Sequence, residues 1–593
     1  AKADDLTKIG KFGIGFKSVY AYTLAPEVHS GDEHFRIEHY VRPHGTPVIE
    51  PGIPWTTLFR FMFDVQEPDP ETAWHEIAER LHNLSARTLL FLRKIKEIEY
   101  RLPNASNGVY LSEETSRGPA RQVTVIGQDS DREEYESWLV FDRPVMIPGS
   151  DEVTHVELAW KLEAATQDSP ERIVKLDRSP LIVYFPTEKQ TPFGFLLQGP
   201  YRTTPARDNI PPEDSWNRML LKESEELLVT ALNHLRGMGL LTASALETLP
   251  IRTRDLVSQN NMFFPIADSV RIALSQQELL PANDESYVSG RNAKLARSID
   301  LRDLLSNRQL CELLQTDNDV KWLSGEITQD RAPDLHKYLI SELKITEIDP
   351  EWFARNLSDV FLMTQDDEWF ARFYEFLVDQ NALWRASKST WQRPGILRSK
   401  PILRLEDGSL VAPFDDSGHP RAYLPGAAQT GFACVRHSIA AHPSALEFLK
   451  QLGLSEPDIV ADVIERILPK FADDGVAQMS DEQYLLDLQS IKDAYNIDSQ
   501  VKRERLFAES RKVPLMKAVN ASSGECAFRT PADTWLPTTD AKLLFAGNPD
   551  YWFVHYSIPQ TLYDVLVSIG VCKQIAPLYR SPSNDGTVSL QHQ

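Results

Sequence analysis

A glycine-rich string near the start of the chain constrains the fold most tightly. Residues 9–20 read Ile-Gly-Lys-Phe-Gly-Ile-Gly-Phe-Lys-Ser-Val-Tyr, with three glycines ahead of an amphipathic stretch. Glycine permits a positive φ and a close approach of the backbone to a ligand. The free N–H groups of a following helix favour an anion. The string therefore predicts a phosphate-binding turn with a helix directly after Gly15. It is neither a P-loop, which ends in Gly-Lys-Ser/Thr, nor a dinucleotide fingerprint, which needs a surrounding βαβ unit.

The whole string, Gly-x-Phe-Gly-x-Gly-Phe-x-Ser, resembles the second glycine box of the GHKL superfamily, which includes gyrase, histidine kinases, MutL and the ninety-kilodalton heat-shock chaperones. The resemblance implies the hinge of an ATP lid that wraps the triphosphate. The residues that it assigns to ATP are Gly10, Lys11, Phe12, Gly13, Ile14, Gly15, Phe16 and Lys17. Of these, Lys17 either adds charge beside the phosphates or faces solvent.

The same resemblance assigns a threonine further along the chain. In the chaperone branch, a threonine opens the last strand of the pocket and hydrogen-bonds the adenine through water. Thr57, which opens Thr-Leu-Phe-Arg-Phe at 57–61, lies in the matching place, with Thr56 as the near competitor. The alternative is that Thr57 is an ordinary β-branched strand residue.

Half of the family's pocket has no counterpart assigned in these 593 residues. In GHKL proteins an upstream glutamate activates the attacking water, an asparagine holds Mg²⁺, and the aspartate of an Asp-x-Gly-x-Gly box reads the adenine amino group. The chain opens with Ala-Lys-Ala-Asp-Asp, without a methionine. We therefore expect ATP and Mg²⁺ to be cofactors of a longer, intact protein. By themselves, the 593 residues are expected to bind ATP poorly, to be inactive, and to expose an apolar sheet face that favours dimerisation or aggregation.

A second pattern occupies residues 181–210, where two apolar strands separated by a Phe-Pro-Thr turn precede Tyr-Arg-Thr-Thr-Pro-Ala-Arg-Asp-Asn-Ile. This resembles the segment after the ATPase module in sacsin-like bacterial proteins. In the chaperone relatives, the middle domain extends a basic side chain to the γ-phosphate, where a cation offsets developing charge. The resemblance makes Arg202 and Arg207 the catalytic candidates. The alternative is that Arg207 pairs with Asp208 or with a helix terminus.

Hydrophobic periodicity and proline-rich boundaries divide the chain into four predicted regions. They are the end of a GHKL ATPase domain (1–70), a middle domain (71–245), a mixed helical region (246–395) and two repeat-like α/β units (396–593). The expected fold class is α+β and multidomain, beginning with a partial Bergerat-type α/β sandwich. Strands are expected at 34–41, 57–63, 95–102, 121–126, 137–141, 154–163, 180–186 and 193–199. Helices are expected at 72–86 and after Pro211-Pro212, a buried helix face at 459–468, and a loop at 42–56.

Two segments of the last region share an order of short motifs. One runs from Lys-Pro-Ile at 400–402 through Gly408 and Tyr-Leu-Pro to Leu-Gly-Leu at 452–454. The other runs from Val-Pro-Leu at 513–515 through Gly524 and Trp-Leu-Pro to Ile-Gly-Val at 569–571. We predict the same strand–turn–helix unit in both, with Leu-Leu-Pro at 279–281 as a third, degenerate copy. Such copies indicate a scaffold or a binding surface.

Composition narrows the class of protein. The formal net charge of −22 disfavours non-specific nucleic-acid binding. No apolar run approaches the ~18 residues that cross a bilayer, and no signal peptide is visible, so the cytoplasm is the default compartment. The cysteines are widely separated and are expected to be buried free thiols without a metal; they are Cys311, Cys434, Cys526 and Cys572.

Three functions stay open at this point. The first is a chaperone-like ATPase of the sacsin type, in which ATP closes a lid, the middle domain docks and a protein client is remodelled. The second is a non-enzymatic scaffold that binds protein partners. The third is a nucleic-acid-processing or phage-defence GHKL protein, which the negative charge opposes. A homodimer is one of the oligomeric states left open.

Overall fold

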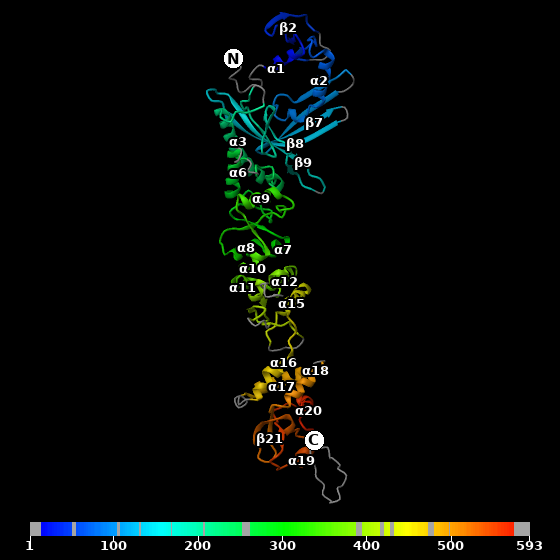
Figure 1. Cartoon of the computed structure of the whole chain (residues 1–593), viewed down its shortest axis with the longest axis vertical. Coiled ribbons are helices and arrows are strands. Elements are labelled where there is room, and N and C mark those ends of the chain that lie inside the picture. The colour runs from blue at the N-terminus through cyan, green and yellow to red at the C-terminus, as the bar shows by residue number, and fades with distance from the viewer. Residues whose placement is uncertain are drawn as a thin grey trace. The chain divides into compact units, whose positions relative to one another are not determined.

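The computed structural model describes residues 14–49, 55–103, 107–129, 132–167, 169–204, 208–251, 256, 261–386, 394–415, 420–426, 432–472, 479–496 and 499–573. The chain divides into two compact units, Ala1–Asn356 and Leu357–Gln593. Both contain helices and sheets, which confirms the predicted α+β, multidomain class (Figure 1). The predicted boundaries between regions near residues 70, 245 and 395 stay predictions.

A four-stranded antiparallel sheet follows the glycine motif. Its order is β3 (Arg42–Gly45), β2 (Glu33–Glu38), β1 (Glu27–Ser30) and β4 (Thr57–Arg60). The helix predicted after the glycines is short, since α1 (Ile14–Lys17) passes directly into a 3₁₀ turn, η1 (Ser18–Ala21). The strands predicted at 34–41 and 57–63 form β2 and β4.

The loop predicted for 42–56 is wrong at its start, where β3 forms. His39 and Tyr40 both adopt positive φ, 49° and 67°, and close a tight turn that returns the chain along β2. Non-glycine residues at positive φ carry no strong turn signal in a sequence. The prolines and Gly45 that follow also mask the strand pattern.

A nine-stranded sheet forms the centre of the first unit. Its order is β12-β11-β13-β9-β8-β7-β6-β5, with β10 beside β9. The bounds are β5 (Glu97–Arg101), β6 (Asn107–Arg117), β7 (Ala120–Asp129), β8 (Arg132–Met146), β9 (Val153–Glu163), β10 (Arg172–Val174), β11 (Pro180–Val183), β12 (Phe185–Gln190) and β13 (Leu196–Gln198). Prediction missed β6, β10 and most of β12: the Phe-Pro-Thr segment expected as a turn is the start of β12, which pairs with β11. The second half of β6 reads Ser-Glu-Glu-Thr-Ser-Arg and is largely exposed, so it shows no apolar alternation.

Both faces of this sheet are covered. On one face, α3 (Ser215–Gly237) packs against β8 and β9 with the buried leucines that its sequence spacing predicted (Figure 1). Asp214 caps its first turn, and Gly239 follows its end at φ 71°. On the other face lies the segment after α2 (Pro70–His82), which begins with the 3₁₀ helix η2 (Ala86–Leu89). The strand β8 is therefore buried on both sides: Trp138 and Val140 face η2, whereas Leu139 and Phe141 face α3.

The rest of the first unit alternates helices with short strands. The elements are α4 (Ala243–Leu246), α6 (Phe264–Gln276), β14 (Leu280–Pro281), β15 (Tyr287–Val288), β16 (Ala293–Ala296), α7 (Ile299–Leu304), α8 (Asn307–Leu314), β17 (Lys321–Trp322), α9 (Pro333–Ser341), β18 (Thr346–Ile348) and α10 (Pro350–Asn356).

The second unit begins with α11 (Asp359–Thr364), α12 (Asp367–Asp379), α13 (Asn381–Trp384), η3 (Ile396–Ser399), β19 (Leu403–Arg404), β20 (Leu410–Val411), α14 (His437–Ala440) and α15 (Pro443–Leu452). It continues with α16 (Ile459–Asp462), η4 (Val463–Ile467), η5 (Leu468–Phe471), α17 (Asp481–Tyr495), α18 (Gln500–Ser510), β21 (Met516–Asn520), β22 (Cys526–Arg529), η7 (Pro531–Asp533), β23 (Thr534–Trp535), α19 (Thr539–Phe545), β24 (Trp552–Val554), η8 (Gln560–Leu562) and α20 (Tyr563–Ser568). The helix face predicted at 459–468 is present, with Val460, Val463, Ile467 and Leu468 buried in one cluster.

The predicted repeat segments, including 279–281, have the same order of elements. Each has an antiparallel hairpin, β14–β15, β19–β20 or β21–β22, and a late helix, α9, α15 or α20. One cross-strand pair also recurs, as Ala282 with Leu323, Leu405 with Val435, and Ala518 with Val554. After the late helix, each segment has a residue at positive φ: Lys344 at 58°, Gly453 at 107° and Gly570 at 117°.

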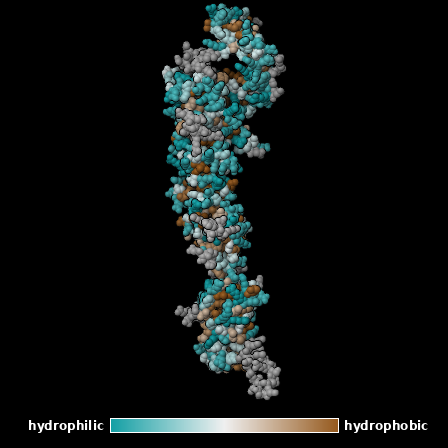
Figure 2. Space-filling model, in the orientation of Figure 1, coloured by the Kyte–Doolittle hydropathy of each residue, from teal (hydrophilic) through white to brown (hydrophobic). Residues whose placement is uncertain are grey.

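Hydrophobic residues are scattered among hydrophilic ones on the face seen in Figure 2, and no described helix has the length and apolarity that crossing a membrane requires. Across the described residues, no group of histidine, cysteine or carboxylate side chains is large enough to hold a metal ion. The four cysteines, all among the described residues, form no disulfide, but the prediction that they are buried is wrong: Cys526 is exposed and the other three are half-buried.

Candidate functional site

The described part of the glycine motif starts at the backbone of Ile14. Gly10, Lys11, Phe12 and Gly13 lie outside the described residues. At Gly15, an added Cβ would meet no atom within 4 Å, and Lys17 is exposed. The ring of Phe16 lies 6.0 Å from that of Phe59, measured between centroids.

These contacts place α1 on the face of the sheet to which the Thr57 side chain points. Thr57 is the first residue of β4, and its hydroxyl lies 2.8 Å from that of Ser30 on the neighbouring strand. Side chains two residues apart in a strand share a face, so Phe59 and Thr57 do. The structure thus brings Phe16 and Thr57, two of the predicted ATP residues, to one face.

The structure describes only one of the two predicted catalytic arginines, Arg202. Arg207 lies outside the described residues. The Arg202 guanidinium makes a 3.3 Å ion pair with Asp214, the N-cap of α3. The backbone of Arg202 also exchanges two hydrogen bonds with the buried side chain of Asn217, at 2.7 and 2.9 Å. In this conformation, Arg202 therefore fastens the 199–204 segment to the start of α3.

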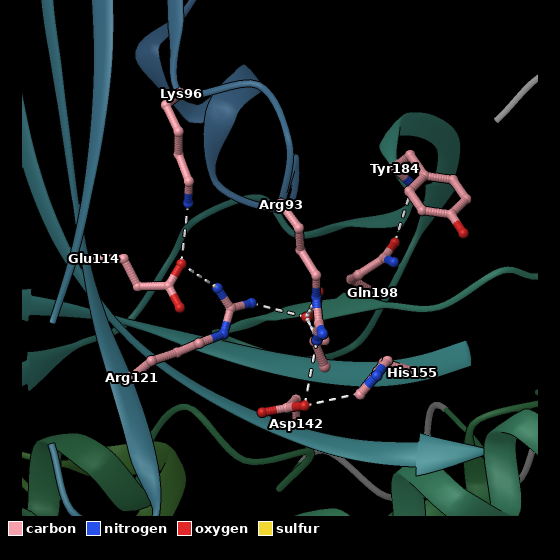
Figure 3. A network of polar contacts seen from close by, with 9 residues as sticks. Arg93, Lys96, Glu114, Arg121, Asp142, His155, Tyr184 and Gln198 are labelled. Atoms are coloured by element: carbon pink, nitrogen blue, oxygen red, sulfur yellow. Dashed lines mark hydrogen bonds and ion pairs between the residues drawn. The ribbon is translucent and has the colours of Figure 1, made fainter. Parts of the chain in front are cut away.

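A polar network lies elsewhere in the first unit, on the face of the large sheet covered by η2 (Figure 3). At its centre is Glu157 of β9, only 1% exposed. Arg93, in the segment after η2, donates to Glu157 Oε1 at 2.5 and 3.1 Å. Arg121 of β7 donates to the same oxygen at 2.8 Å. Burial disfavours the charged form of Arg93, but the carboxylates of Glu157 and Asp142 outweigh it and raise its pKa.

The network extends to both sides of Glu157. Asp142 receives a 3.3 Å hydrogen bond from Arg93 and lies 2.8 Å from His155 Nδ1. Glu114 lies 3.2 Å from both Arg121 and Lys96. The drawn network thus joins three cationic side chains to three carboxylates, and their charges balance (Figure 3).

A cavity of about 420 Å³ opens beside this network, in the size range of small-molecule sites. Its residues come from the segment after η2, from the start of β9, and from Tyr184 and Gln198. Gln198 and Glu157 stand directly opposite each other on β13 and β9. Tyr184 has φ 62° and donates its backbone N–H to Gln198 Oε1 at 3.0 Å.

Sequence reasoning missed this cavity. One signal was available: Glu157 is the one acid inside the apolar run Val-Glu-Leu-Ala-Trp, and a charge there must be paired once the strand is buried. The partners were not visible, because Arg93, Arg121 and Gln198 are 64, 36 and 41 residues away from it (157 − 93, 157 − 121 and 198 − 157).

Comparison with known proteins does not assign the chain to a family. No protein-family model matches the chain, and no solved structure matches it. The chain is similar to Protein NO VEIN of Arabidopsis thaliana, with 25% identity over 314 residues. The match covers 47% of this chain and 11% of that protein, so the chain spans only a small part of its relative's length.

Proposed function

We propose that residues 9–63 contribute to an ATP-binding site and that the protein is a chaperone-like GHKL ATPase acting on a protein client. The observation that carries this proposal is the placement of α1, which contains Gly15, the last glycine of the motif, and lies on the sheet face that Thr57 shares. Backbone N–H groups after the glycines would bind phosphates, and Thr57 would lie toward the base. The nucleotide would be ATP with Mg²⁺, whose glutamate, asparagine and aspartate partners are not assigned in this chain.

A matched pair of glycine variants tests the phosphate contact. An added Cβ meets no atom within 4 Å at Gly15 or at Gly45 of β3, so alanine fits both sites. We expect Gly15→Ala to weaken ATP binding by the complete natural protein ~10-fold, because the methyl group holds a phosphate away from the backbone. Gly45→Ala should leave binding unchanged. Equal affinities for the two variants, or no ATP binding by the complete protein, would refute the proposal.

The catalytic role proposed for the arginines is tested by turnover. Arg202→Ala and Arg207→Ala should each be compared with the natural protein in ATP hydrolysis and in melting temperature. A catalytic cation accounts for at least a ~10-fold change in rate, about 1.4 kcal/mol of barrier. If Arg202→Ala lowers only the melting temperature, its bond to Asp214 is its whole contribution.

A protein-binding scaffold is the second candidate, and the recurring units favour it. The three segments repeat one hairpin, one cross-strand pair and one helix end, without a shared set of catalytic side chains among the residues that the structure describes. Stacked copies of one unit commonly present extended binding surfaces. Client binding that is insensitive to ATP and to Gly15→Ala would favour the scaffold over the ATPase. A nucleic-acid role is the third candidate and predicts salt-dependent DNA binding, which the charge of −22 opposes.

A further inference from the structure

We propose that the cavity beside Glu157 binds a small, uncharged, planar molecule through a carboxamide-type edge, with its apolar body held between the segment after η2 and the start of β9. This site is distinct from the nucleotide site proposed above and does not depend on it. The residues that carry the inference are Glu157, Gln198 and the apolar side chains around them.

Gln198 supplies a hydrogen-bond donor to the cavity. The residue is only 3% exposed, and its Oε1 accepts the backbone N–H of Tyr184 at 3.0 Å. That bond orients the amide, because an oxygen must face the N–H group. The NH₂ group therefore points away from Tyr184, and no described residue accepts from it.

Glu157 supplies an acceptor beside this donor. Arg93 and Arg121 both bond to Oε1, and among the described residues none donates to Oε2. Glu157 and Gln198 form a cross-strand pair, so their Cβ atoms lie ~5 Å apart on one face of the sheet. Both residues are buried and line one cavity, so the carboxylate oxygen and the amide NH₂ group need a ligand or water to complete their bonds.

The charge around the cavity selects an uncharged ligand. The three cations of the network are matched by three carboxylates, so the network itself has no positive charge left for a carboxylate or a phosphate (Figure 3). Lys94 also lines the cavity, but it lies outside this network and is exposed to solvent, which weakens its attraction for an anion. An anion would also lie against Glu157 Oε2. A cation would pair with Glu157 but would leave the Gln198 NH₂ group facing another donor.

The walls suit a flat apolar body. Phe91 and Leu92 are buried in the lining, whereas Ile95 and Val153 are half-exposed at its edge. Tyr184 completes the lining in a left-handed conformation, and non-glycine residues in such conformations are concentrated at binding sites. A carboxamide or lactam on an aromatic ring has the required acceptor and donor on one carbonyl carbon, and an apolar ring behind them.

Three molecules of equal shape test the chemistry: benzamide, benzoate and benzamidine. Saturation-transfer NMR on the whole chain should give benzamide a dissociation constant on the order of 1 mM, which suits a fragment of this size. Benzoate and benzamidine should bind at least ~10-fold more weakly. Val153→Trp should abolish benzamide binding by filling the cavity edge. The matched control is Val360→Trp, the same change at an exposed residue of α11 in the other unit.

Gln198→Met removes the hydrogen-bond donor. It should weaken the binding of benzamide at least ~10-fold and should not tighten the binding of benzoate. If this variant does not fold, Val153→Trp decides the result alone, because its side chain is at the surface. The proposal is overturned if benzamide shows no saturation transfer at about 5 mM, if benzoate or benzamidine binds as tightly, or if benzamide binds Val153→Trp as it binds the natural chain. None of these results bears on ATP binding by the complete protein.

Discussion

Two buried tyrosines make the same pair of hydrogen bonds to the first residues of successive repeat segments. Tyr374 of α12 donates to Ile402 O at 2.8 Å and accepts from Arg404 N at 3.4 Å. Tyr484 of α17 donates to Leu515 O at 3.1 Å and accepts from Lys517 N at 3.0 Å. Burial raises the pKa of both hydroxyls well above the ordinary tyrosine value. Each tyrosine therefore fastens a helix to the first strand of the following hairpin.

Replacing either tyrosine by phenylalanine tests this function. Tyr374→Phe and Tyr484→Phe should each lower the free energy of unfolding by about 1–3 kcal/mol, because a buried carbonyl and a buried N–H group lose their partner. Tyr556→Phe is the control, since Tyr556 is 87% exposed and such changes stay within about 0.5 kcal/mol. Urea denaturation monitored by tryptophan fluorescence measures all three. Equal stability of Tyr484→Phe and Tyr556→Phe would contradict the assigned role.

The ion pairs of Glu136 should make the stability of the fold depend on pH. Arg87 binds its carboxylate through two hydrogen bonds of 2.6 and 2.7 Å, and Lys161 binds it at 2.8 Å. Burial opposes ionisation, but these bonds outweigh it and hold the pKa of Glu136 below its usual value. A depressed carboxyl pKa stabilises the fold above the unfolded pKa of about 4.3, and this contribution disappears as the pH falls through the lower, folded pKa.

We therefore expect Glu136→Gln to lower the free energy of unfolding at pH 7 by about 1–3 kcal/mol. The difference from the natural chain should shrink as the pH drops below about 4. Denaturation curves at pH 7, 5, 4 and 3 measure it (values chosen to bracket the unfolded pKa of about 4.3). A difference that grows toward low pH would show that Glu136 does not stabilise the fold as a carboxylate.

At the scale of elements, the late helix of each repeat segment ends in the same way. A residue shortly after the helix lies at positive φ, and the N–H group that follows it turns back to the helix: Ile345 N to Leu339 O, Leu454 N to Leu449 O, and Val571 N to Leu566 O. Gly453 and Gly570 meet this requirement without a side chain. Lys344 meets it with one, at a steric cost that glycine avoids.

Substitutions at these helix ends should have opposite signs. Gly453→Ala and Gly570→Ala should each destabilise by roughly 1–2 kcal/mol, because a Cβ is disfavoured at φ values of 107° and 117°. Lys344→Gly should be neutral or stabilising by up to about 1 kcal/mol. Thermal melts of the three variants check the signs. Stabilisation by Gly453→Ala would show that its backbone leaves the left-handed region in solution.

At the scale of the whole molecule, two compact units with their own cores should unfold separately. Scanning calorimetry of the chain should show more than one transition. Residues 357–573, produced alone, should fold and should melt at the temperature of one of these transitions. A fragment that starts at 400 lacks α12 and its Tyr374 and should not reproduce that melt. One two-state transition for the whole chain would contradict the division.

The sequence by itself determined the elements whose signals are local. The helical spacing of the leucines after Pro211-Pro212 predicted α3 and its buried face, and Leu-Gly-Leu and Ile-Gly-Val marked the ends of α15 and α20. The glycine motif predicted a helix directly after Gly15, and a short helix is present there, although α1 begins at Ile14. In each case, a few neighbouring residues set the backbone geometry, so no distant contact was needed.

Only the tertiary structure decided where side chains meet. Glu157 faces Gln198 because β13 lies beside β9, although β10, β11 and β12 separate them in the chain. Arg93 and Arg121 reach the same carboxylate from a loop and from β7. Sheet order and register are set by the packing of whole layers against η2 and α3, and that packing energy is spread over residues far apart in sequence. For the same reason, local pattern could not tell that Cys526 is exposed or that Arg202 pairs with Asp214.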